Sequence, residues 1–261
     1  MNSFDLGPVT ITGDLLAVLL VAGVALLLLL LFTRRRPAGE GSEPRPLPAF
    51  ALLQRQIGQA VENGSQIHVG LGRASLVDRR SSATIAGLQV LDSLAEESCA
   101  NDTPPIITVG EGTILPAAQD KLYHAYARAE RLRDFVPETV RFVADAGRPL
   151  VYAAGAADAV DNENVSANVL VGHFGAELAL LTEAGARRQT EQSIGSDDPL
   201  ALAIGAATTE HLLVGEEFLA AGAYLERRPN QLAALQVQDV LRLVLALTVV
   251  GAAAYQLLLG G

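Results

Sequence analysis

The chain has 261 residues, half of them hydrophobic, and a formal net charge of −10. Between Glu40 and Gln238 there are 26 acidic and 15 basic residues, a balance that repels nucleic acid phosphates and excludes nucleic acid as an expected partner. Cys99 is the only cysteine, so no intrachain disulfide is expected, and no Cys/His spacing is that of a zinc site.

The first predicted element is a membrane-spanning helix over residues 15–33, after a short N-terminus at 1–14. Leu15–Phe32 contains no charged side chain and, at about 1.5 Å per residue, is long enough to cross the apolar core of a bilayer. A cleaved signal peptide would have basic residues before its apolar run, whereas here Arg34–Arg36 follow it. We therefore interpret this segment as a retained anchor whose arginines stay in the cytoplasm.

Residues 34–48 are basic and then rich in Pro and Gly, which is typical of a semi-extended linker. A soluble α/β domain is predicted over 49–235. It opens with a helix over 51–64, where apolar residues recur at helical spacing until Asn63-Gly64 ends the pattern.

The rest of this domain alternates short β-rich runs with helical runs rich in small residues. The predicted strands lie within 66–72, 105–112, 139–147, 166–175, 191–198 and 211–217. The predicted helices are 82–97, 114–130, 149–160, 176–184, 199–210 and 217–225. Leu178, Leu180 and Leu181 would also fit a strand. This alternation predicts βαβ units and a doubly wound, mostly parallel, Rossmann-like sheet of about six strands.

A second membrane helix is predicted over 240–260. The apolar run Leu243–Gly261 is flanked by Arg242 on the side of the soluble domain, so the positive-inside rule again places that domain in the cytoplasm and both termini outside. Gly251 and the alanines that follow lower the hydrophobicity of the run. They would let another helix approach closely, in a homo-oligomer or a membrane complex, and a buried amphipathic helix is the alternative.

In a parallel sheet, ligands bind beyond the carboxyl ends of the strands. Each predicted strand here ends in a turn with Gly or an acidic residue, so these turns should meet at one edge of the sheet. The candidate site residues in the turns are Gly70, Gly72, Arg73, Ser75, Gly110, Glu111, Gly112, Thr113, Gly172, His173, Gly175, Ser196, Asp197 and Glu216.

The first turn, Gly70-Leu71-Gly72-Arg73-Ala74-Ser75, partly matches the dinucleotide fingerprint, in which glycines admit pyrophosphate to a helix N-terminus. Ser75 replaces the third glycine, the helical pattern resumes only near Ser81, and no acidic residue ends the next strand. The turn therefore fits a tight loop that serves the fold, or a site for another anion that Arg73 would hold.

Two further turns have both a structural and a functional interpretation. Thr113 after Gly110-Glu111-Gly112, and an acid before Pro199, are typical N-caps. Asp197 or its neighbour Asp198 could instead hold a divalent ion or a ribose.

His173 lies between Gly172 and Gly175 at the end of a predicted strand. A histidine can act as an acid or a base near neutral pH, so His173, with Glu111, Asp197 or Glu177 to orient it, is the candidate catalytic group. The other histidines, His68, His124 and His211, fit structural positions.

Taken together and in this order, HVGLGRASL, TVGEGT, SANVLVGHFGAE, GSDDPLALA and LVGEEFLAAGAYL, followed by an apolar C-terminal run, resemble an uncharacterised family of bacterial membrane proteins known only as a domain of unknown function. The resemblance covers about residues 50–255. It implies a two-pass protein of the bacterial inner membrane with the layout given above, and it implies no activity, cofactor or catalytic residue.

Three hypotheses on function stay open at the level of sequence. The first is a membrane-anchored cytoplasmic module that binds a small ligand or a protein partner. The second is a membrane-tethered enzyme that acts on a phosphorylated or nucleoside-like small molecule through His173 with Glu111 or Asp197. The third is a structural organiser of a membrane complex. The sequence identifies no cofactor and contains neither a Gly-x-Ser-x-Gly elbow nor a Walker loop.

Overall fold

A computed structural model describes residues 48–225 continuously, and outside that range only residues 4–5, 10–11, 23, 26, 241–242 and 245–246. The chain divides into two units, one of Arg45–Glu226 and one of Met1–Pro44 with Arg227–Gly261. In the second unit, β1 (Phe4–Asp5) pairs antiparallel with β2 (Thr10–Ile11). Apart from a few isolated helical positions, the predicted spans at 15–33 and 240–260 and the linker at 34–48 lie outside the described residues.

No helix within the described residues is both long and apolar enough to cross a bilayer.

The first unit is built on a sheet of six strands, all parallel, which confirms the predicted α/β class. The strands lie in the order β5-β4-β3-β6-β7-β8. Numbered within the sheet this is 3-2-1-4-5-6, the order of a Rossmann fold. Their bounds are β3 Gln66–Gly72, β4 Ile106–Val109, β5 Val140–Phe142, β6 Val165–His173, β7 Glu191–Ser196 and β8 Leu212–Val214.

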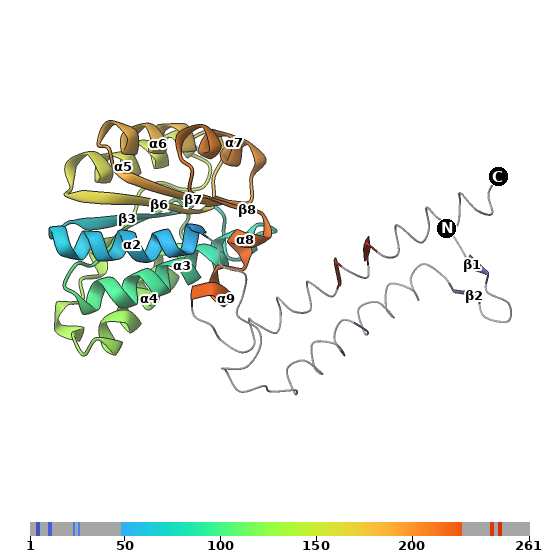
Figure 1. Cartoon of the computed structure of the whole chain (residues 1–261), viewed down its shortest axis with the longest axis horizontal. Coiled ribbons are helices and arrows are strands. Elements are labelled where there is room, and N and C mark those ends of the chain that lie inside the picture. Colours follow the sequence, from blue (N-terminus) through green and yellow to red (C-terminus); the bar gives the residue numbers. More distant parts are fainter. Residues whose placement is uncertain are drawn as a thin grey trace. The chain divides into compact units, whose positions relative to one another are not determined.

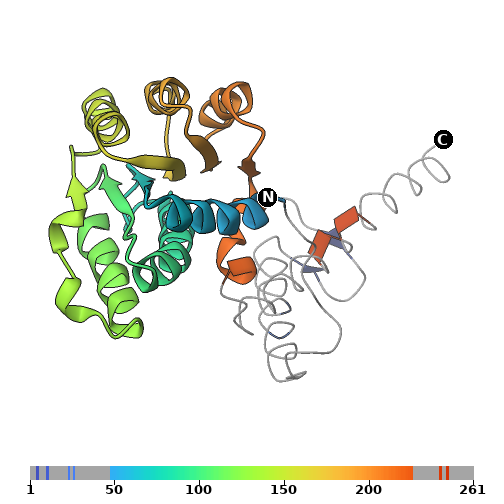
Figure 2. The ribbon, with the colours of Figure 1, turned by 60° about the vertical axis from the view of Figure 1, so that its left-hand side comes forward.

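Helices cover both faces of this sheet, as Figures 1 and 2 show. On one face lie α2 (Pro48–Asn63), α3 (Ser81–Ala100) and α4 (Ile114–Arg128), together with α8 (Glu216–Leu219) and α9 (Ala221–Leu225). On the other face lie α5 (Pro149–Asn162), α6 (Leu178–Arg187) and α7 (Pro199–Thr208). Two short 3-10 helices, η1 (Leu132–Asp134) and η2 (Pro137–Thr139), precede β5.

Each face has its own apolar core. Ile67, Val69 and Leu71 of β3 belong to the core under α3 and α4, whereas Leu170 of β6 packs with Tyr152 of α5 on the other face. Because successive side chains of a strand point to opposite faces, the alternate residues of β3, which include His68 and Gly70, turn toward α5. Parallel strands covered on both sides have almost no exposed positions, and all four residues of β4 are buried.

Most predicted elements are present with boundaries that differ by a few residues. The segment 176–184, which also fitted a strand, is helical as α6. The predicted helix 217–225 is wrong in one respect, because it is divided into α8 and α9 with Ala220 between them. Cys99 is fully buried in α3, and burial raises the pKa of its thiol to about 12. It is therefore an inert core residue.

Candidate functional site

The strand order changes direction between β3 and β6, whose carboxyl ends lie side by side. From this point the chain continues to α3 on one face and to α6 on the other. The loops after the two strands therefore separate, which makes this position the one where ligands bind in Rossmann folds. Seven predicted site residues lie at the ends of these two strands or in the loops that follow, namely Gly70, Gly72, Arg73, Ser75, Gly172, His173 and Gly175. Gly110 and Asp197 follow the neighbouring strands β4 and β7.

Two glycines bring the ends of β3 and β6 unusually close together. Gly72 and Gly172 both have positive φ, +71° and +148°. A Cβ on Gly72 would lie 2.8 Å from the backbone nitrogen of His173, and one on Gly172 would lie 2.8 Å from the carbonyl carbon of Leu71. Glycine is therefore required at both positions by the neighbouring backbone as well as by its own conformation.

Two backbone N–H groups of the Gly70–Ser75 turn donate hydrogen bonds within the protein. The Gly72 N–H donates to the Tyr152 hydroxyl at 3.2 Å, and the Arg73 N–H donates to the His173 carbonyl at 3.0 Å. The helix after this turn begins only at Ser81. The turn is thus a tight loop that joins two strands, and the N–H groups of Gly72 and Arg73 are engaged within the protein, unlike the free N–H groups that a dinucleotide fingerprint presents to pyrophosphate.

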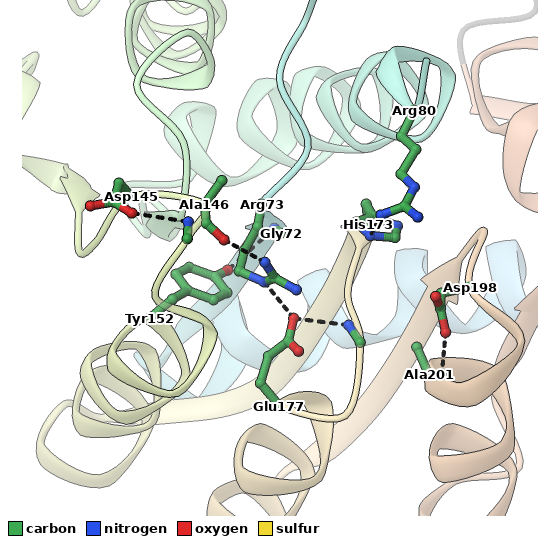
Figure 3. A network of polar contacts seen from close by, with 12 residues as sticks. Gly72, Arg73, Arg80, Asp145, Ala146, Tyr152, His173, Glu177, Asp198 and Ala201 are labelled. Carbon is green, nitrogen blue, oxygen red and sulfur yellow. Dashed lines mark hydrogen bonds and ion pairs between the residues drawn. The ribbon is translucent and has the colours of Figure 1, made fainter. Parts of the chain in front are cut away.

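Arg73 and Glu177 form an ion pair beneath this junction (Figure 3). The Arg73 Nε donates to Glu177 Oε1 at 2.6 Å, and its Nη1 donates to the Ala146 carbonyl at 2.6 Å. Glu177 is almost fully buried and also accepts from the Gly175 N–H at 2.8 Å. Burial alone would raise the pKa of the Glu177 carboxyl, but the bonds from Arg73 and Gly175 outweigh it and hold that pKa below its usual range. The charge of Arg73 is thus neutralised within the protein.

The ring of His173 lies between a carboxylate and a guanidinium. Its Nδ1 lies 2.7 Å from Asp197 Oδ1, and its Nε2 lies 2.7 Å from Nη1 of Arg80 (Figure 3 shows the guanidinium beside the ring). A guanidinium can only donate, so Nε2 accepts and its lone pair is engaged. Nδ1 then carries the proton and donates it to the Asp197 carboxylate. His173 is buried, whereas Arg80 and Asp197 are exposed.

A second cluster links the loops after β3 and β4. The Thr113 hydroxyl accepts from the Leu76 N–H at 3.1 Å and donates to the Glu111 carboxylate. Ser75 Oγ lies 3.1 Å from the same Thr113 hydroxyl oxygen. Glu111 also accepts from the Thr113 N–H at 2.7 Å. Thr113 stands at the N-cap position of α4 but makes no capping bond, so the predicted cap is wrong because its hydroxyl is used between loops.

The remaining candidates are spread along the same edge. A Cβ on Gly70 would lie 3.3 Å from the Tyr152 hydroxyl and one on Gly110 would lie 2.9 Å from the Tyr152 ring, whereas a Cβ on Gly112 would meet nothing within 4 Å. Ser196 is buried and accepts from the Asp198 N–H at 3.3 Å. Asp198 caps α7 by accepting from the N–H groups of Leu200 and Ala201, which confirms the predicted helix start. Glu216 begins α8 beyond the edge strand β8, and its side chain is outside the described part of the chain.

Of the acids proposed to orient His173, Asp197 contacts it, whereas Glu111 bonds to Thr113 and Glu177 to Arg73. Sequence reasoning missed Arg80 and the partnership of Arg73 with Glu177. The signal for Arg80 was present, because Arg79 and Arg80 directly precede α3 and positive charge is unfavourable at a helix N-terminus. Among the described residues, no group of three or more His, Cys, Asp or Glu side chains is placed to hold a metal ion.

These features define a Rossmann-like α/β domain with a polar cluster at the switch point of its sheet. The family comparison then identifies the chain: it belongs to the family described as Domain of unknown function (DUF6754), whose model matches residues 10–259. The match confirms the resemblance to an uncharacterised family. No curated protein and no solved structure matches the chain.

Proposed function

We propose that this protein is a membrane-anchored cytoplasmic module that binds a small ligand at the junction of β3 and β6. The observation that supports this best is the arrangement of Arg80, His173 and Asp197. Arg80 and Asp197 come from the loops after β3 and β7, His173 ends β6, and the three side chains meet at the position where Rossmann folds bind ligands. Polar groups that converge at a switch point are a common mark of a ligand site.

The membrane anchor is part of the same proposal. It is supported by the two apolar runs, Leu15–Phe32 and Leu243–Gly261, and by the arginines on their inner flanks. The family match covers residues 10–259, which includes all of the first run and all but the last two residues of the second. We place the protein in the bacterial inner membrane, with the described domain in the cytoplasm.

A labelling experiment tests the anchor and its orientation. In a Cys99→Ser background, single cysteines are introduced at Ser3 and at the exposed Asn101, and intact cells are treated with a membrane-impermeant maleimide. We expect label at position 3 before permeabilisation and at position 101 only afterwards. Equal labelling of both positions in intact cells, or recovery of the protein in the soluble fraction, would contradict the anchor.

Capture of small molecules tests the ligand site. The full chain is extracted in mild detergent, incubated with a pooled metabolite library, washed and denatured, and the released molecules are identified by mass spectrometry. We expect at least one molecule that the wild type retains and that the Asp197→Ala variant loses. The Asp134→Ala variant, which changes an exposed acid on η1, is the control and should retain it. An identical profile for all three proteins would reject the site.

An enzyme is the second candidate, and the Asp197–His173 contact of 2.7 Å favours it. A carboxylate that accepts from Nδ1–H fixes the ring and stabilises an imidazolium, so Nε2 could serve as a general base once Arg80 moves away. Turnover of the captured molecule, abolished in His173→Ala without a change in melting temperature, would identify the enzyme. Retention without turnover would leave a binding module, and a stoichiometric co-purified membrane protein with no captured molecule would favour a structural organiser.

A further inference from the structure

The two arginines at the β3–β6 junction differ in how their charge is compensated. Arg73 is only 15% exposed and faces the carboxylate of Glu177 at 2.6 Å. Arg80 is exposed, and within the described part of the chain its side chain forms one hydrogen bond, to the neutral Nε2 of His173 at 2.7 Å. Of the two, Arg80 is therefore the cation whose charge is not balanced by the group it touches.

A neutral imidazole is a weak partner for a guanidinium. Arg80 offers five N–H donors in a planar fork, and its contact with His173 uses Nη1 alone. A phosphate offers several charged acceptor oxygens and binds such a fork through two parallel hydrogen bonds, which are stronger than a bond to a neutral acceptor. A phosphate that reaches Arg80 should therefore replace Nε2 of His173 as the hydrogen-bond acceptor of the guanidinium.

The surroundings of His173 allow it to respond to that displacement. Asp197 accepts from Nδ1 on one side of the ring, and Arg80 covers Nε2 on the other. If Arg80 turns to a phosphate, the lone pair of Nε2 becomes free to take a proton from solvent or from the phosphate. The resulting imidazolium is paired with Asp197 through Nδ1–H and can donate from Nε2 to the same phosphate.

We propose that the ligand of the β3–β6 junction contains a phosphate group, and that this group binds by taking Arg80 from Nε2 of His173. The inference rests on the proposed ligand site and adds to it the chemical class of the ligand and the residue that recognises it. The geometry on which it depends is the Arg80–His173–Asp197 chain beside an Arg73 that Glu177 already neutralises.

Nuclear magnetic resonance of ring nitrogens in detergent-extracted full chain, labelled with 15N-histidine, tests the exchange. Inorganic phosphate is titrated at constant ionic strength and pH. We expect a saturable shift of the His173 nitrogens, assigned by its absence in His173→Gln, toward the positions of an imidazolium. The Arg80→Gln variant should lose that saturable response. Arg79→Gln removes the same charge one residue away and, because the Arg79 side chain is exposed, should keep it.

Each outcome bears on the proposal. A flat wild-type titration, or a saturable response that survives in Arg80→Gln, overturns it. A second arm uses nanodiscs of phosphatidylglycerol without free phosphate, which distinguishes a lipid headgroup from a soluble phosphate compound as the source. If phosphate has no effect while the capture experiment retains an uncharged molecule through Asp197, the phosphate inference fails and the ligand site stands. If both experiments are negative, both proposals fail.

Discussion

His68 Nδ1 donates to Oδ1 of Asn168 at 2.7 Å, and both side chains are completely buried inside the sheet. Nε2 of the same ring then accepts from the Thr108 hydroxyl at 2.9 Å. One chain of hydrogen bonds therefore joins the three neighbouring strands β6, β3 and β4 through the ring of His68.

This relay should make stability depend on pH through His68. Burial, together with the charge of Arg141 and against the bond to Asn168, lowers the pKa of His68 from 6.5 to about 4. Between these two pH values His68 is protonated in the unfolded chain and neutral in the folded chain. The free energy of unfolding therefore falls as the pH drops from 6.5 toward 4. The loss amounts to about 3 kcal/mol over that window and roughly 2 kcal/mol between pH 7 and pH 5.

Denaturant unfolding of the detergent-extracted chain at several pH values measures this slope. We expect His68→Gln to be less stable than the wild type at neutral pH, because the relay is disturbed, but to lose little further between pH 7 and pH 5. His124→Gln changes an exposed histidine of α4 and should follow the wild type. Parallel curves for the wild type and His68→Gln would contradict the assignment.

The glycines at the junction should tolerate alanine very differently from glycines elsewhere. Gly172→Ala adds a Cβ into the Leu71 carbonyl at a φ of +148°, and we expect a loss of about 3 kcal/mol or more in the free energy of unfolding. Gly64→Ala has a φ of +60° but meets nothing within 4 Å, so about 1 kcal/mol is expected from strain alone.

Gly112→Ala completes this series, because it has neither a positive φ nor a neighbour within 4 Å. It should be neutral or stabilising by up to about 1 kcal/mol, since alanine restricts the unfolded chain. Equal losses for Gly172→Ala and Gly64→Ala would show that the strands at the junction can separate to admit a methyl group.

Removal of Arg73 should be costly because it leaves Glu177 buried without a cation. We expect Arg73→Ala to lose about 3–5 kcal/mol near neutral pH. Arg141→Ala breaks an ion pair with Glu163 whose side chains are 42% and 38% exposed, and should lose no more than about 1 kcal/mol. Chemical unfolding of the three proteins gives the comparison.

The sign of the pH effect at Glu177 provides a further check on Arg73→Ala. The pKa of Glu177 is lowered in the folded protein, so the pair stabilises the fold above the ordinary pKa of a glutamate and this stabilisation is lost as the pH falls through the lowered value. The difference between the wild type and Arg73→Ala should therefore shrink in acid. A difference that stays constant would mean that Arg73 stabilises by packing alone.

The Asp198 N-cap of α7 should make a measurable contribution to the free energy of unfolding. Asp198 Oδ1 accepts from the N–H groups of Leu200 at 2.9 Å and Ala201 at 3.2 Å. We expect Asp198→Ala to lower the free energy of unfolding by about 1 kcal/mol, and Asp198→Asn to retain most of the cap because asparagine is an equally good N-cap residue. If Asn is as destabilising as Ala, the loss comes from charge and the cap contributes little.

Local sequence pattern was enough to predict the six strands and the longer helices of this domain. β3 ends at Gly72 as predicted, because the β-branched and apolar run stops at a glycine that the turn requires. Local pattern could not predict the strand order, because β3 pairs with β6 through residues about 100 positions apart in the sequence, such as His68 and Asn168. The division between α8 and α9 at Ala220 was also missed, because small apolar residues continue through it.

The candidate site was predictable only in part, for the same reason. The expectation that strand-end loops share one edge follows from parallel pairing alone, and it placed His173 and Asp197 on the same side. The choice of Asp197 over Glu111 as the partner of His173 depends on which strands are neighbours. Arg80 lies in the long turn before α3, where no periodic pattern indicates the direction of a side chain.

The order of the strands also determines when the protein can fold during its synthesis. β3 emerges from the ribosome first among the six strands and finds β4 soon afterwards, but its other edge stays open until β6 has been made. At about 5–20 residues per second, the separation of His68 and Asn168 corresponds to a delay on the order of ten seconds. Throughout that interval the nascent chain exposes an unpaired strand edge, which is a template for aggregation, so its production in cells should depend on chaperones that bind nascent chains.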